Sequence, residues 1–88
     1  IGSDSNVLID MSEELRLLEY GQRLAARARN VMAHGPGGST GQAMFDAALL
    51  GGAQALGIAG GLAVGRAADM IALDPDHASL AGKRGTAI

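Results

Sequence analysis

The sequence contains no cysteine and no tryptophan, and it has one phenylalanine, one tyrosine and two prolines. Without cysteine there is no disulfide framework, no thiolate metal site and no thiol nucleophile. The formal net charge is −2, so the basic excess typical of a nucleic-acid-binding protein is missing and no nucleic-acid partner is expected. The lack of cysteine is compatible with the reducing cytoplasm, where we expect the protein to reside.

Small residues dominate what is present. Seventeen alanines and fourteen glycines make up more than a third of the 88 residues. Hydrophobic residues account for 48% and charged residues for 18%, which is too apolar for a disordered chain. Because many of the hydrophobic residues are alanine and aromatic anchors are few, we expect a weak core. We therefore expect one small domain that needs a partner surface for its stability.

The clearest periodic segment is predicted to be a helix from Ser12 to about Met32. Asp10 and Glu13 have the spacing of a capping box at its start. Glu19 and Arg23 form an i,i+4 pair, which we interpret as part of a solvated face. The opposite, apolar face is defined by a repeating 4-3 spacing. Its members are Leu17, Gly21, Leu24, Ala28 and Val31.

A second helix is predicted from Thr40 to Leu56. Ser39 and Gln42 form a second capping box, and Gly57 is the expected stop. The segment is apolar on nearly every side, a pattern typical of a helix that is buried against neighbours. Since this chain offers little cover for it, we expect copies to associate into a homo-oligomer through Thr40–Leu56.

After Gly57 the pattern changes to short apolar runs. Residues 62–64 and 69–74 are separated by a loop that contains glycine, which predicts a β-hairpin within Leu62–Leu73. Pro75 ends the second run, and residues 76–88 show no periodicity. The chain thus divides into a helical part, 1–57, and a part with short strands, 58–88.

Two motifs, separated by about sixty residues, are similar to those of the amidohydrolase superfamily. The first is Gly2-Ser3-Asp4-Ser5, which resembles the motif at the end of the eighth barrel strand. The second is Gly61-Leu62-Ala63-Val64-Gly65-Arg66-Ala67-Ala68-Asp69-Met70-Ile71-Ala72-Leu73-Asp74, which resembles the closing segment that returns to a small β-sandwich. Their order and spacing, with two helices between them, also fit that superfamily.

Further runs resemble the formimidoylglutamate deiminases of histidine degradation, a family within this superfamily. The resemblance covers essentially all 88 residues, which correspond to about the last fifth of such an enzyme. We therefore expect a C-terminal piece that lacks its own start. The runs are Gly2–Asn6, Glu13–Leu24, Ala47–Gly57 and His77–Gly82.

The resemblance implies a fold and a division of the chain. Residues 1–57 would be the end of a (β/α)8 barrel with two helices, and residues 58–88 the returning strands of the small β-sandwich. Taken alone, the chain should be mainly α with a short β-hairpin.

The resemblance also implies a chemistry. Members hydrolyse N-formimidoyl-L-glutamate, a small molecule, to N-formyl-L-glutamate and ammonia with one divalent metal, usually zinc. The strand-eight aspartate, here Asp4, binds the metal and takes a proton from the attacking water. The family's histidine ligands lie on strands absent from this chain, and His34 and His77 do not match them. We therefore expect no metal and no activity in the isolated chain, with the substrate contacts elsewhere.

Three alternatives remain open at this stage. The chain could be a helical module that self-associates without catalysis, with Leu49 and Leu50 as its central contacts. It could belong to a related deaminase, such as one acting on guanine. A membrane span over Ala43–Val64 is long enough, but Asp46 and the central glycines oppose it, so no membrane partner is expected.

Overall fold

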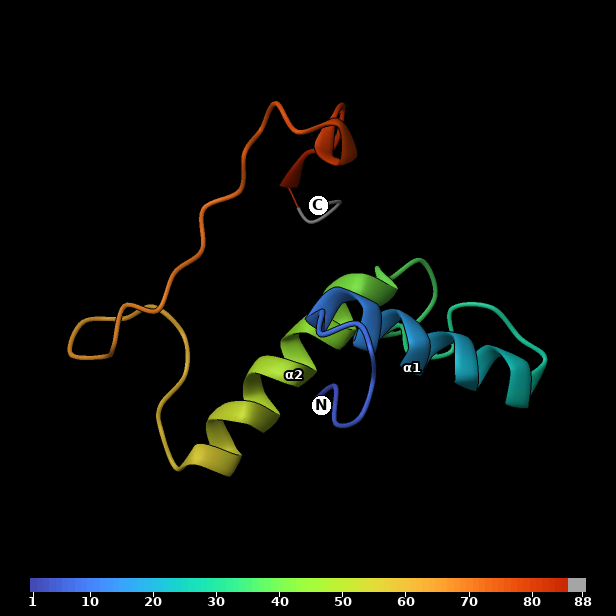
Figure 1. The fold of residues 1–88 in the computed structure, drawn as a ribbon, viewed down its shortest axis with the longest axis horizontal. Helices are drawn as coiled ribbons and strands as arrows, with labels where there is room; N and C mark the ends of the chain where they lie inside the picture. Colours follow the sequence, from blue (N-terminus) through green and yellow to red (C-terminus); the bar gives the residue numbers. More distant parts are fainter. Residues whose placement is uncertain (86–88) are drawn as a thin grey trace.

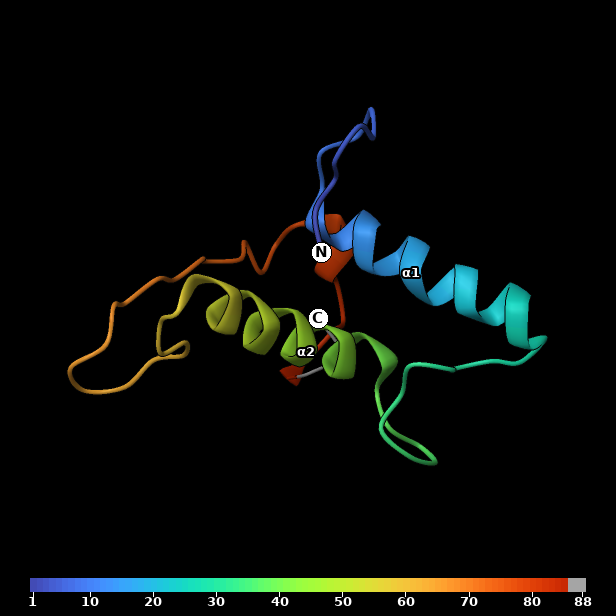
Figure 2. The ribbon, with the colours of Figure 1, turned by 90° about the horizontal axis from the view of Figure 1, so that it is seen from below.

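A computed structural model describes residues 1–85 of the chain. Two α-helices, α1 (Met11–Ala26) and α2 (Thr40–Leu56), precede a short 3-10 helix, η1 (Ala78–Leu80). Within the described residues there is no β-strand, so the expectation of a mainly helical chain is confirmed. The linker between the helices turns the chain back, and after α2 the chain leaves the helices as an open arm (Figure 1, Figure 2).

The start of α1 follows the predicted capping pattern. Asp10 has extended backbone angles, and its carboxylate accepts a hydrogen bond from the Glu13 backbone N–H at 3.1 Å. Glu13 and Glu14 lie in the first turn, where the helix dipole favours negative charge. The predicted end is wrong, however, because α1 stops at Ala26 rather than near Met32.

The second helix has the predicted bounds. The Ser39 hydroxyl accepts from the Gln42 backbone N–H at 3.2 Å, which satisfies one free donor of the first turn. The Gln42 side chain does not complete the capping box, since it donates to Asp46 at 2.7 Å instead. Gly57 ends the helix with a φ of 66°, a left-handed conformation that costs glycine little.

The predicted hairpin within Leu62–Leu73 is wrong for the described chain. The arm makes a turn at Gly65, but no ladder of strand hydrogen bonds follows. Its apolar side chains lie in solvent, with Val64 fully exposed and Ile71 82% exposed. A two-stranded hairpin is marginal without a further strand or a packing surface, and the helices do not supply one here. Residues 86–88 of the predicted strand region lie outside the described residues.

Among the described residues the buried core is very small. Of residues 1–85, only Ala43, Met44 and Glu19 are buried. As expected from the little cover that this chain offers it, much of the apolar surface of α2 lies open, and Leu50 is 73% exposed. The predicted faces of α1 are also reversed, because Leu24 is 81% exposed while the Glu19 side chain is enclosed.

No helix within residues 1–85 combines the length and apolar character that crossing a bilayer would require.

Candidate functional site

Asp4, the predicted catalytic and metal-binding residue, lies in a tight turn before α1. The Asn6 backbone N–H donates to the Ser3 carbonyl at 2.7 Å, and Asp4 itself is exposed with a φ of 43°. Aspartate adopts this left-handed conformation more readily than most residues. The Asn6 side-chain amide donates to the Glu14 carboxylate at 2.8 Å, so the turn is tied to the first turns of α1. The carboxylate of Asp4 is thus presented to solvent from an anchored turn.

The described residues do not form a complete metal site around Asp4. Across residues 1–85, no group of three or more His, Cys, Asp or Glu side chains is placed to hold a metal ion. His77 has another local role, because its Nδ1 accepts from the Ser79 backbone N–H at 3.2 Å at the start of η1. A catalytic zinc normally has three protein ligands, and Asp4 can supply one of them.

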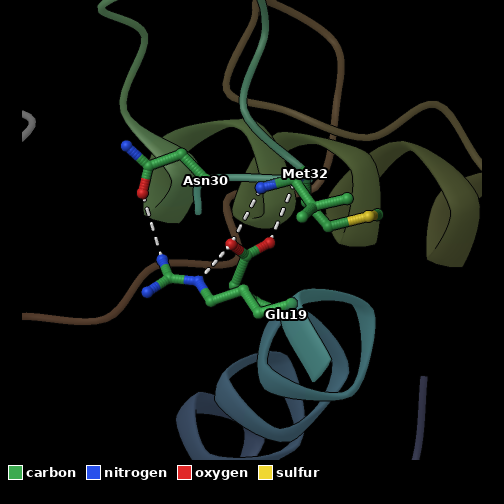
Figure 3. A network of polar contacts seen from close by, with 5 residues as sticks. Glu19, Asn30 and Met32 are labelled. Carbon is green, nitrogen blue, oxygen red and sulfur yellow. Dashed lines mark hydrogen bonds and ion pairs between the residues drawn. The ribbon is translucent and has the colours of Figure 1, made fainter. Parts of the chain in front are cut away.

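A cluster around Glu19 has the most side-chain hydrogen bonds among the described residues, and the sequence analysis identified only its Glu19–Arg23 pair. Glu19 is 4% exposed, and its Oε1 accepts from Arg23 Nε at 2.6 Å and from the Val31 backbone N–H at 3.0 Å. Its Oε2 accepts from the Met32 backbone N–H at 2.9 Å. Arg23 also donates to the Asn30 side-chain oxygen at 3.1 Å. Figure 3 shows the carboxylate pointing from α1 to the linker backbone.

Charge-assisted hydrogen bonds dominate the electrostatics of this Glu19 cluster. The Arg23 side chain, followed by the N–H groups of Met32 and Val31, lowers the pKa of the Glu19 carboxyl, although burial acts in the opposite direction. Because these donors occupy both oxygens, the carboxylate acts as a structural anchor. The i,i+4 pair of Glu19 and Arg23 was visible in the sequence. Asn30 was the available sign of a turn after the helix, because asparagine tolerates a positive φ.

An open groove of about 770 Å³ separates α1 from the first half of α2. The Glu19 and Arg23 side chains form part of its wall, and Asp4 is not among the residues that line it. The groove is mostly apolar, and the arm contributes to it. Its main apolar lining residues are Leu15, Met44, Phe45, Ile71 and Leu73.

Comparison with known proteins supports the resemblance seen in the sequence. The chain is 52% identical over 89 aligned residues to the formimidoylglutamate deiminase of Pseudomonas aeruginosa. The match takes in all of this chain but only 20% of that enzyme, so the chain spans about a fifth of its relative's length. No family model and no solved structure matches the chain. The resemblance to formimidoylglutamate deiminase is therefore confirmed from end to end of these 88 residues.

Proposed function

We propose that this chain is the C-terminal part of a metal-dependent hydrolase that acts on the C–N bonds of amidines. Its substrate in this proposal is N-formimidoyl-L-glutamate, which the complete protein converts to N-formyl-L-glutamate and ammonia in the cytoplasm. The observation that carries the proposal is the 52% identity to a formimidoylglutamate deiminase over the whole chain, including the segment that contains Asp4.

In this proposal Asp4 accepts a proton from the attacking water in the complete protein. A carboxylate positioned next to the reacting water can act as a general base. The exposed position of Asp4 and the hydrogen bond that ties its turn to Glu14 support this role. A bound divalent metal, usually zinc in the resembling family, would supply a more acidic water, and Asp4 would be one of its ligands.

The 88 residues alone are inactive in this proposal, because they supply one carboxylate where a catalytic zinc needs three protein ligands. They also self-associate through α2. The side chains of Leu49 and Leu50 are 55% and 73% exposed, and a soluble protein rarely leaves a large apolar surface uncovered. Neither a nucleic acid nor a membrane is a partner in this proposal.

The test is ammonia release from N-formimidoyl-L-glutamate by the complete protein and its Asp4→Asn variant. We expect a loss of turnover of about 10²- to 10⁴-fold, the range for removing a general base. The matched control is Asp76→Asn, which changes an exposed aspartate of the arm and should leave turnover unchanged. Guanine serves as the second substrate.

Each part of the proposal can fail separately. Near-normal turnover in Asp4→Asn would remove the role of Asp4 while leaving the reaction in place. Activity on guanine without activity on N-formimidoyl-L-glutamate would replace the substrate and favour a guanine-type deaminase.

A further inference from the structure

The end of α1 is the point where local sequence preference and the structure disagree. The 4-3 apolar spacing continues through Val31, which favours helix to about Met32. In the structure Arg27 adopts a left-handed φ of 50°, and Asn30 a φ of 52°. The backbone N–H groups of Val31 and Met32 then bond to the Glu19 carboxylate at 3.0 and 2.9 Å.

These two arrangements exclude one another. In a continued helix the N–H groups of Val31 and Met32 would bond to the carbonyls of Arg27 and Ala28, four residues earlier. In the structure the same two N–H groups donate to the Glu19 carboxylate. A donor that is satisfied by a buried carboxylate is not free to extend the helix, and bonds to a charged acceptor are the stronger kind.

We propose that Glu19 sets the length of α1: its carboxylate captures the Val31 and Met32 amides and stops the helix at Ala26, and without the carboxylate α1 extends to about Met32. Arg23 supports the shorter form, since it holds both Glu19 and Asn30. The longer form adds about 9 Å of helix. The linker that remains, residues 33–39, includes three glycines and can span up to about 24 Å.

The two forms differ at the wall of the groove between the helices. Glu19 and Arg23 both line that groove, opposite Met44 and Phe45 of α2. When Glu19 releases the linker, the linker no longer covers the carboxylate, and Arg23 loses its contact with Asn30. Glu19 therefore acts as a positioning residue for the linker and for this wall.

The test is the backbone NMR shift pattern of the 88-residue chain with Glu19→Gln. Glutamine has one acceptor oxygen where the carboxylate has two, so at least one of the three donors loses its partner. We expect helical Cα shifts to appear over residues 27–32, as the Val31 and Met32 N–H groups bond to the carbonyls of Arg27 and Ala28 in place of Glu19. The control is Glu13→Gln, which removes an ion pair to Arg16 on the same helix at 2.8 Å and should not change residues 27–32.

A second variant separates helix extension from general loosening. Adding Arg27→Gly to Glu19→Gln favours the left-handed end at position 27, so the helical shifts over 27–32 should disappear again. Residues 27–32 that stay non-helical in Glu19→Gln would overturn the proposal. Loss of helical shifts throughout Met11–Ala26 would also overturn it, because Glu19 would then support the whole helix instead of its end.

Discussion

The two parts of the chain differ in how much regular secondary structure they form. Between Asp10 and Gly57 the backbone forms two capped helices that begin where the sequence predicts. From Ile58 to His77 the backbone is an arm without helix or strand, and its side chains are exposed. The apolar content of the two parts does not explain this difference, because α2 is itself strongly apolar and largely uncovered.

The difference lies in where each kind of structure finds its hydrogen-bond partners. A helix satisfies its backbone from residues four positions away, and caps such as Asp10 and Ser39 complete its ends. A strand needs a neighbouring strand and a surface to pack on. The segment Leu62–Leu73 has the pattern of strands but finds no such neighbour among the described residues.

The largest expected effect is the loss of helix when a proline is placed in the middle of α2, compared with a proline in the arm. Ala48→Pro removes a hydrogen bond within α2 and clashes with the preceding turn, at a cost of about 3 kcal/mol or more. We expect much of the helical circular dichroism signal of α2 to be lost. Ala72→Pro places the same residue in the arm and should leave the signal unchanged. If both variants lost the same amount of helix, the arm would be contributing to the helical fold.

The next largest expected effect concerns the apolar surface through which two copies of the chain associate. Leu50 of α2 and Leu62 of the arm are similarly exposed, at 73% and 66%. We expect Leu50→Glu to weaken self-association at least tenfold, or about 1.4 kcal/mol, in sedimentation equilibrium, because a charge would be buried between helices. Leu62→Glu should have little effect. A compact monomer for the unaltered chain at micromolar concentration would contradict association altogether.

The smallest expected effect is a graded loss of stability in acid. Hydrogen bonding lowers the pKa of Glu19, chiefly through Arg23, and that of Asp10, chiefly through the Glu13 backbone N–H. A carboxyl group whose pKa is lowered by folding stabilises the fold when the pH is above its ordinary pKa, which is about 4.3 for Glu and 3.9 for Asp. This contribution is lost as the pH falls through the pKa of the group in the folded state. The midpoint of thermal unfolding, followed by circular dichroism, should therefore decrease as the pH is lowered below about 4.3.

The double variant Asp10→Asn with Glu19→Gln provides the control for that titration. It lacks both carboxylates, so its unfolding midpoint should depend less on pH than that of the unaltered chain. An equally steep acid dependence of the midpoint in the double variant would assign the loss of stability to other groups.

Much of the helical part was predictable because its determinants are local. The capping residues Asp10 and Ser39 and the stop at Gly57 act within a few positions of themselves, so short spacings identify them. The turn that contains Asp4, before α1, was seen only in the structure. The catalytic role of Asp4 stays a prediction, because the other groups it would act with are not among the described residues.

The sequence alone was sufficient for the two helix starts, for the end of α2 and for the resemblance to formimidoylglutamate deiminase, since all of these depend on residue order over short distances. Tertiary structure decided where α1 ends and which of its faces is enclosed. Glu19 meets Val31 and Met32 only after the linker folds back, and this long-range capture outweighs the local preference for further helix. Tertiary structure also decided the state of Leu62–Leu73, because strands form only where partner strands exist.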